Sequence, residues 1–548
     1  RLLDPNVLAD TFTARQQIRN VYGFPEKLDI DRYTLRDPAT GQTKTRDYVV
    51  AARELNSLGL SENQDTWINR HTVYTHGNGF VAAPANEVVA GAEGGEPNFT
   101  TRDLPPVGPI TIDQPRIYYG ELIKDYSVVG APKGAAKREF DQPEGGSSEG
   151  QISNTYDGKG GVSVGSFFRQ LTFAIYYRER NFLLSNQVND ASKVMYVRDP
   201  RERVEKAAPF LQVDGDPYPA VINGRVTWML DGYTTSDSYP YAEQMQLGQA
   251  AADALTGTGT TALPDETFNY IRNSVKATVD AYDGTVTLYA WNEKDPVLKT
   301  FMKAFPNTVK PKSAMSEELV SHVRYPEDLF KVQREVLTRY HVSNPVDFFN
   351  QSDRWQIPED PTRNTREDQP PYYILAQRPG ADTASFQLTS ALNAFERDNL
   401  SAFITASSDP GSYGQIKVLR LPGNTPFRGP QQVQNSFLSN NQVRPDLTLF
   451  DSGSSDAVFG NLLTLPIGNA GLLYVEPLYV RGSGDSGFPL LQKVLVNFGD
   501  RIGYGNTLAE ALDEVFGAGA GKSATDSGGG STTRGGTDST ATPTTTAP

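Results

Sequence analysis

The sequence predicts an α+β fold of more than one subdomain, in which antiparallel hairpins mix with amphipathic helices. Two dipeptides, Asn223-Gly224 and Asp283-Gly284, lie between runs of apolar and β-branched residues. Both dipeptides suit the positive φ angles of a tight hairpin turn. Apolar residues recur at helical spacing after Asp295-Pro296 and after Pro326. Because strands and helices do not alternate regularly, these signals favour α+β over a doubly wound parallel sheet.

The first elements are read from caps, turn residues and apolar runs. Asp4-Pro5 is typical of a helix start, and Gly23 is typical of its end. The segments expected to follow are strands at 28–35 and 47–53, a loop rich in proline and glycine at 84–116, a strand at 116–123, and a long exposed loop or linker at 133–161.

A helix is expected directly after that linker. Its apolar residues recur at helical spacing and predict a face that packs into the protein, made of Phe167, Phe168, Leu171, Ala174 and Ile175. The helix should run to about Tyr177.

The remaining elements complete two α+β regions, at 1–310 and 311–517. They are helices at 295–305, 326–340 and 507–516, a helix opening at 429–430, a polar stretch broken by prolines at 351–371, and strands at 372–376, 402–406, 415–421, 462–466, 472–480 and 490–498. The tail at 518–548 is rich in Gly, Ser and Thr and should be disordered.

Composition bounds the class of protein. The chain has 548 residues and a formal net charge of −14, which argues against nucleic acid as a main partner. It has no cysteine, so disulfides, thiolate nucleophiles and sulfur-ligated zinc are excluded. The chain starts at Arg1 and not at methionine, and no leader sequence follows, which suggests that the N-terminus has been cut. No run of apolar residues reaches the length of ~18 that a membrane-spanning helix requires.

One segment concentrates polar and aromatic chemistry. Residues 67–80 contain two of the four histidines, and the candidate polar site within them consists of Trp67, Asn69, Arg70, His71, Tyr74, His76 and Asn78. His71 and His76 would lie roughly 140° apart on a helix, and on opposite faces of a strand. Only a turn could bring the two imidazoles together, and Gly77-Asn78-Gly79 offers one.

Two interpretations of this segment stay open. The functional one is a polar pocket or a histidine switch, because imidazole titrates near physiological pH. The structural one is a helix capped by Asp65 and ended by Gly77, whose histidines hydrogen-bond to neighbouring backbone.

Other motifs are weaker. Ser163 lies in a G-x-S-x-G pattern, but a polar loop precedes it where a nucleophile elbow needs a buried strand, so it is expected near a helix N-cap. Ser486 lies in a Gly-Asp-Ser-Gly loop without a partner motif. Asp214-Gly215-Asp216 is expected to be a turn, and Glu327 and Asp328 should complement a helix N-terminus. No catalytic residue, cofactor or metal site is predicted.

Several long motifs together carry a resemblance to a known family. They are Arg1 to Leu8, Gly23-Phe24-Pro25, Trp67 to Gly77, Gln114 to Glu121, Asp214 to Pro219, Tyr270 to Lys276, Arg324 to Phe330, Gly429 to Gln432 and Gly460 to Thr464. In these segments the chain resembles Uncharacterised Protein Family 0182, over essentially residues 1–517.

The resemblance implies a location more than a reaction. Family members look like bacterial integral membrane proteins with several spanning helices and a large extracytoplasmic domain. This chain would be that soluble domain, at the plasma membrane and facing outward. Its expected partners are its own transmembrane half and other envelope proteins or lipids. The family brings no established activity, cofactor or catalytic residue.

Three functions are therefore considered. The leading one is a non-enzymatic interaction, assembly or transport module of the cell envelope. The first alternative is an envelope hydrolase or transferase that uses the segment 67–80, with His71 or His76 as general base. The second is a ligand-binding domain that supplies the membrane half, which would need a large apolar pocket.

Overall fold

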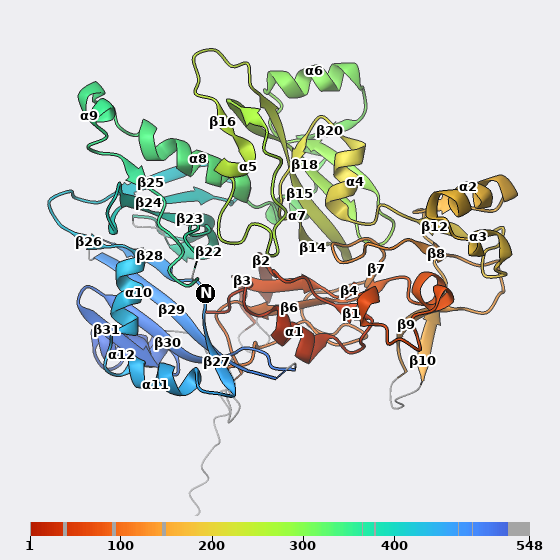
Figure 1. The fold of residues 1–548 in the computed structure, drawn as a ribbon, viewed down its shortest axis with the longest axis horizontal. Coiled ribbons are helices and arrows are strands. Elements are labelled where there is room, and N and C mark those ends of the chain that lie inside the picture. Colours follow the sequence, from red (N-terminus) through yellow and green to blue (C-terminus); the bar gives the residue numbers. More distant parts are fainter. Residues whose placement is uncertain are drawn as a thin grey trace, which may run out of the picture.

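The computed structural model describes residues 2–36, 41–89, 95–144, 150–363, 365–377, 380–468, 471–484 and 486–523. The architecture is α+β with several subdomains, as the sequence predicts (Figure 1). Nearly all named strand pairs are antiparallel. The exception among them is the parallel pairing of β19 (Val286–Ala290) with β20 (Val309–Pro311).

The N-terminal subdomain is built on a three-stranded sheet in the order β2-β3-β6. Its strands are β2 (Asp29–Arg36), β3 (Thr43–Ala52) and β6 (Phe80–Pro84). Helix α1 (Ala9–Gln16) begins later than Asp4-Pro5 predicts. Residues 5–8 form turns that lead into the helix, and the Asp4 carboxylate accepts hydrogen bonds from the backbone N–H groups of Asn6, at 3.0 Å, and of Asn461, at 2.6 Å.

The second sheet contains the two predicted hairpins. Its strands are β13 (Gln212–Val213), β14 (Tyr218–Ile222), β15 (Arg225–Ser236), β18 (Tyr270–Asp280), β19 and β20. Asn223 and Gly224 both have positive φ and join β14 to β15, which confirms the first hairpin. The second predicted hairpin also forms, between β18 and β19. In its turn only Gly284 has a positive φ angle, so the predicted two-residue turn at Asp283-Gly284 is wrong.

Helices that begin at Asp-Pro flank this sheet. They are α4 (Pro200–Ala207) and the predicted α6 (Pro296–Ala304). The carboxylates of Asp199 and Asp295 accept hydrogen bonds from the first backbone N–H groups of these helices, which fixes both starts.

The third sheet follows α7 (Glu317–Ser321), α8 (Glu327–Tyr340) and α9 (Pro345–Asn350). Its strands are β21 (Trp355–Gln356), β22 (Tyr372–Gln377), β23 (Ala384–Ala394), β24 (Asn399–Ser407), β25 (Ile416–Arg420) and β26 (Phe427–Arg428). Strands β22, β24 and β25 confirm predictions. The long strand β23 was not predicted, because polar residues interrupt its apolar positions.

The fourth sheet completes the chain. Its strands are β27 (Ser455–Phe459), β28 (Leu463–Ile467), β29 (Gly471–Gly482), β30 (Leu490–Phe498) and β31 (Arg501–Gly505). The accompanying helices are α10 (Pro430–Leu438), α11 (Val443–Phe450), α12 (Leu508–Phe516) and the short η4 (Ala520–Ser523). The start of the predicted disordered tail is thus ordered, because Gly521 donates to the Asp513 carboxylate. Positions 524–548 lie outside the described residues.

Smaller elements connect the strands and helices of these sheets. They are β1 (Tyr22–Gly23), β4 (Glu54–Leu55), η1 (Ser57–Gly59), η2 (Asn69–Val73), β5 (Gly77–Asn78), β7 (Arg116–Ile117), β8 (Ser127–Val129), β9 (Glu139–Pro143), β10 (Gln151–Asn154), β11 (Val162–Ser163), α2 (Phe167–Tyr177), α3 (Asn181–Leu184), β12 (Lys193–Met195), β16 (Met245–Gln246), α5 (Leu247–Ala250), β17 (Thr267–Phe268) and η3 (Lys312–Ala314). The predicted exposed loop at 133–161 therefore contains a hairpin, β9-β10, whose first residue Glu139 is fully buried. Positions 145–149 of that loop lie outside the described residues.

Helix α2 forms where the sequence predicts it but faces the other way. Phe167, Phe168 and Ile175 are 62%, 79% and 69% exposed, so the expected buried face is wrong. Of the predicted face, Ala174 does pack inward. It is joined by Phe173 and Tyr177, whose rings pack against the buried Phe182 of α3. The α2–α3 hairpin projects from the molecule at the right edge of Figure 1. Its outer surface exposes Phe168, Tyr176 and Leu184.

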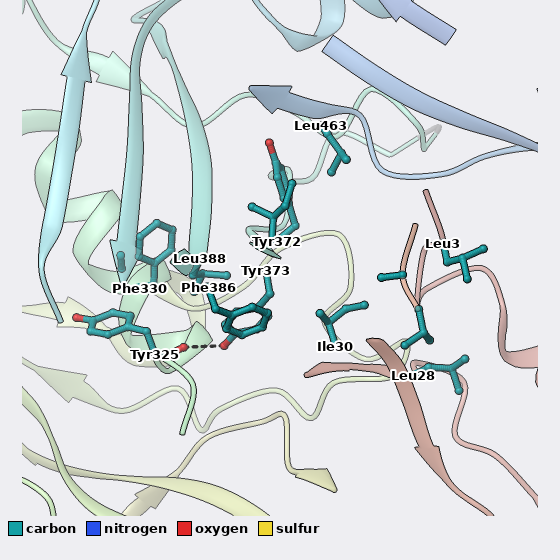
Figure 2. Packing of buried hydrophobic residues seen from close by; sticks show 14 of the residues in the cluster. Leu3, Leu28, Ile30, Tyr325, Phe330, Tyr372, Tyr373, Phe386, Leu388 and Leu463 are labelled. Atoms are coloured by element: carbon teal, nitrogen blue, oxygen red, sulfur yellow. Dashed lines mark hydrogen bonds between the residues drawn. The ribbon is translucent and has the colours of Figure 1, made fainter. Parts of the chain in front are cut away.

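A single apolar cluster joins residues from both ends of the chain. Figure 2 shows Leu3 and Ile30, from the N-terminal part of the chain, in the same cluster as Phe386 and Leu463. The Tyr373 hydroxyl, in the same cluster, donates to the backbone oxygen of Tyr325 at 2.6 Å. The division of the chain at residue 310 stays a prediction, although this core contains residues from either side of it.

Buried ion pairs gather at the N-terminus of α8. Lys27 lies 2.8 Å from Asp216, Arg324 lies 3.1 Å from Asp29, and Lys331 lies 2.8 Å from Asp253. Because buried charges are tolerated when they are paired, these contacts can link the start of β2 to the turn before β14, and the α8 region to β2 and to the loop after α5.

Candidate functional site

The segment 67–80 folds into a helical turn and the short strand β5, and it ends at the first residue of β6. Its single π-helical turn, η2, ends at Val73, and β5 then pairs with β7. The predicted helix between Asp65 and Gly77 is therefore confirmed only over residues 67–73. Asp65 does not cap it, because its carboxylate accepts two hydrogen bonds from the Arg70 guanidinium, at 2.7 and 2.5 Å. Gly77 is required at its position, since a Cβ there would lie 2.3 Å from the Arg53 carbonyl oxygen.

His71 has a packing role. Its Nδ1 lies 2.7 Å from the backbone oxygen of Tyr126, and its ring stacks on the Tyr126 ring with centroids 4.0 Å apart. Trp67 completes the cluster, because its indole N–H donates to the Tyr126 hydroxyl at 2.8 Å. Burial lowers the pKa of His71, so the neutral imidazole is favoured.

His76 belongs to a second, more polar network. Its Nε2 lies 3.3 Å from a carboxylate oxygen of Asp141, and its Nδ1 lies 3.0 Å from the Thr75 hydroxyl. Arg116 donates two hydrogen bonds to Asp141, both at 2.8 Å, and Asn78 donates to the same carboxylate at 3.1 Å. Burial alone would raise the pKa of Asp141, but the hydrogen bonds from His76 and Arg116 lower it to about 2.

The other members of the predicted site lie at the rim of these networks. The Asn69 side chain donates to the Gln64 carbonyl at 2.8 Å, and Arg70 contacts the carboxylate of Asp125 in addition to that of Asp65. Tyr74 packs on Phe140, with ring centroids 5.6 Å apart. The seven candidate residues thus divide into a cluster around Tyr126, a network around Asp141 and a rim.

Three residues of this network were not predicted from the sequence. Arg116, Glu139 and Asp141 complete it, and the Tyr118 hydroxyl donates to Glu139 at 2.6 Å. Glu139 and Asp141 alternate along β9, so both point to one side of that strand. That alternation within the presumed loop was the signal available in the sequence.

The cavities described for this structure lie elsewhere. None of the five has His71 or His76 in its lining. With its imidazoles packed against Tyr126 and Tyr118, the segment 67–80 can hold strands together. It lines no described cleft that could hold a substrate.

A different histidine does line a cleft. His322 Nδ1 lies 2.6 Å from the Asp31 carboxylate, although the two residues are far apart in the sequence. The cleft beside His322, of about 520 Å³, is also lined by Arg32, Ser321 and Asp409. The Ser321 hydroxyl donates to the Glu318 carbonyl at 2.7 Å, so it is not engaged by the imidazole. This pair could act as an oriented acid–base group.

The weaker motifs have structural roles. Ser163 is exposed and lies in β11, close to Ser166, the N-cap residue of α2, so the expectation that it lies near the start of that helix is confirmed. Asp214 accepts a hydrogen bond from the backbone N–H of Asp216, which confirms the predicted turn. Glu327 and Asp328 begin α8 as predicted, and Lys331 lies 3.2 and 3.4 Å from their carboxylates. Position 485, next to Ser486, lies outside the described residues.

The fold and the site define a multi-sheet α+β protein in which the histidines of the segment 67–80 are engaged in packing and hydrogen-bond networks. Comparison with related proteins identifies its family. The chain belongs to the Uncharacterised protein family UPF0182, whose family model matches residues 1–450.

Three relatives illustrate the match. The UPF0182 protein of Saccharopolyspora erythraea is 54% identical over 541 residues, covering 96% of this chain and 55% of the relative. The UPF0182 protein of Frankia alni is 52% identical, over 96% of this chain and 50% of its own length. That of an Arthrobacter species is 50% identical, over 96% and 53%. The chain thus spans about half the length of the curated relatives it matches. No solved structure matches it.

The described residues contain neither a candidate membrane-spanning helix nor a candidate metal-binding group. Within these residues, no helix combines the length and the apolar character needed to cross a bilayer. Among the same residues, no group of three or more acidic or histidine side chains is arranged to hold a metal ion.

Proposed function

We propose that this chain is the extracytoplasmic module of a bacterial integral membrane protein, and that it works by docking within the cell envelope and not by catalysis. The observation that carries the proposal is the outer surface of the α2–α3 hairpin. Phe168, Tyr176 and Leu184 are all more than 70% exposed there. Exposed apolar groups gathered on one projecting element mark a surface that contacts a partner or a membrane.

The charge of the hairpin supports a membrane surface as the partner. Residues 166–184 carry three arginines and one glutamate, in a chain whose net charge is −14. Helices that combine aromatic and aliphatic side chains with arginine bind at the interface of anionic bilayers. The relatives extend well beyond the matched region, which leaves room for a membrane-embedded half of the same protein.

The hydrogen bonds made by the two histidines of the segment 67–80 favour a non-enzymatic role. His71 faces a backbone carbonyl, and His76 shares the Asp141 carboxylate with Arg116 and Asn78. Groups that are held in this way stabilise a fold, whereas a general base needs access to its substrate.

The location can be tested in the native, full-length protein in cells. The chain has no cysteine, so Lys299→Cys, on the exposed side of α6, adds one label site to it, and the full-length protein without this substitution gives the background labelling. We expect a membrane-impermeant maleimide to label this variant in intact cells. A cytoplasmic protein with one cysteine serves as the control and should react only after lysis. Labelling of Lys299→Cys only after lysis would refute an outward-facing module.

The His322–Asp31 pair supports one alternative, an envelope hydrolase or transferase. In that case generic ester, peptide or glycoside substrates should be turned over by the purified chain. The activity should fall in His322→Gln and Asp31→Asn and persist in His71→Gln. If no substrate is turned over, or if both variants keep full activity, the pair does not act as a catalytic base.

A further inference from the structure

A groove lies between the third and fourth sheets, away from both histidine networks. One wall comes from β22, β23, β24 and β25, and the other from β28 and β29. Its volume of about 620 Å³ is in the range of small-molecule sites, which measure about 300–1,000 Å³.

Most of the groove is apolar. Its apolar lining includes Ile374, Phe403, Leu419, Leu465, Ile467 and Leu473. Leu419 and Ile467 are each more than one-third exposed, so the apolar lining reaches the surface of the protein. A site of this shape can take an acyl chain that enters from the solvent.

Two polar side chains in the groove have atoms without a hydrogen-bond partner. Among the described residues, neither the side-chain oxygen of Gln387 nor the hydroxyl of Thr405 has one. Gln387 is only 3% exposed and Thr405 only 6%. Buried polar groups are almost always paired, because an unpaired one is costly. Two such atoms in one groove therefore indicate a site whose polar partner is a ligand.

A positive charge lies next to these atoms. Lys417, on the edge strand β25, is the register partner of Thr405 on β24, so both side chains lie on the same face of the sheet. Lys417 is exposed and also lines the groove. A polar end made of Gln387, Thr405 and Lys417 thus adjoins the apolar half that begins at Phe403.

We propose that this groove binds a single-chain amphiphile whose head carries both a hydroxyl and an anionic group, as in a lysophospholipid. The acyl chain would lie along Phe403, Leu419 and Leu473. The head hydroxyl donates to the Gln387 side-chain oxygen, the Thr405 hydroxyl donates to an oxygen of the head, and Lys417 pairs with the phosphate. This site is independent of the location proposed above.

The test is calorimetric titration of the chain with lysophosphatidylglycerol below its micelle concentration. We expect saturable binding at one site, and weaker binding of palmitate, which lacks the hydroxyl. Thr405→Val and Lys417→Gln should each weaken binding of lysophosphatidylglycerol roughly tenfold.

Matched controls separate the site from general effects. Thr101→Val removes another buried hydroxyl without a partner among the described residues, and Lys299→Gln removes an exposed lysine elsewhere. Both should bind like the wild type. Because Thr405→Val removes an unpaired buried group, its melting temperature should not fall. Absence of saturable binding, equal binding of palmitate, or unchanged binding by Thr405→Val and Lys417→Gln would overturn the proposal.

Discussion

Asp141 accepts hydrogen bonds from His76, Asn78 and Arg116. Against the opposing effect of burial, the hydrogen bonds from His76 and Arg116 lower the pKa of its carboxyl group to about 2. A carboxyl whose pKa is lower in the folded state stabilises the protein above its unfolded pKa of 3.8 and loses this effect as the pH falls towards 2. After a discount for partial solvent screening, this contribution is about 1–2 kcal/mol.

The variant Asp141→Asn tests this contribution. At pH 7 it should unfold more easily by at least that amount, because Arg116 loses its charged partner. Between pH 4 and pH 2 its stability should fall less than that of the wild type. Urea unfolding at several pH values measures both effects. Asp65→Asn, which alters an exposed pair with Arg70, should change little, and equal effects of the two variants would refute a special role for Asp141.

Glu54 shows the opposite shift. It is fully buried, and burial raises its pKa to about 8, although the Leu122 backbone N–H donates to it at 2.8 Å. The folded state therefore binds this proton more tightly than the unfolded state. The stabilisation is complete below the unfolded pKa of 4.5 and is lost as the pH rises through about 8.

Glu54→Gln should remove this pH dependence. The amide oxygen still accepts from Leu122 but carries no charge, so the variant should gain roughly 2–4 kcal/mol over the wild type at pH 9. At pH 5 the gain should be much smaller. Denaturant titration at the two pH values gives the difference, with the exposed Glu62→Gln as control. A gain of the same size at both pH values would contradict a raised pKa.

At the scale of elements, the sequence predicted those that depend on local signals. The Asn223-Gly224 hairpin and the start of α6 at Asp295-Pro296 formed as expected, because their turn and cap chemistry lies within a few residues. Strands β9 and β23 were missed, because their polar residues are buried by partners far away in the chain.

The candidate site follows the same rule. The sequence identified the polar segment around His71 and His76, but it could not supply Tyr126 and Asp141, which complete the two networks from outside that segment. The outward face of α2 was missed for a related reason. Helical spacing shows which residues share a face, but the inward direction is set by contacts of Phe173 and Tyr177 with Phe182.

The exposed face of the α2–α3 hairpin leads to a prediction about lipid. The purified chain should float with vesicles that contain phosphatidylglycerol, and less with vesicles of phosphatidylcholine alone. Phe168→Asp should reduce the bound fraction several-fold, because it places a charge in the centre of the apolar face. Leu58→Asp, at a site that is 86% exposed on another element, is the matched control. Equal flotation of both variants with the wild type would show that the hairpin does not bind lipid.

At the scale of the whole molecule, the N-terminal segment fastens the first sheet to the last. The Tyr479 hydroxyl, on β29, donates to the Leu2 carbonyl at 2.6 Å and accepts from the Asp4 backbone N–H at 2.9 Å. Thr11 on α1 donates to the carbonyl of Pro489 at 2.6 Å. These contacts join the two ends of the described chain, so opening of one sheet should expose the other.

Tyr479→Phe tests this coupling between the ends of the chain. It removes two hydrogen bonds of buried backbone groups, for which we expect a loss of about 1–3 kcal/mol. Hydrogen exchange should then accelerate roughly tenfold in β3 as well as in β29, because the sheets open together. Tyr340→Phe, which removes an exposed hydroxyl bonded to Glu243, should leave both rates unchanged. Faster exchange confined to β29 would show that the fourth sheet opens independently, and that the shared core does not make the two predicted regions one cooperative unit.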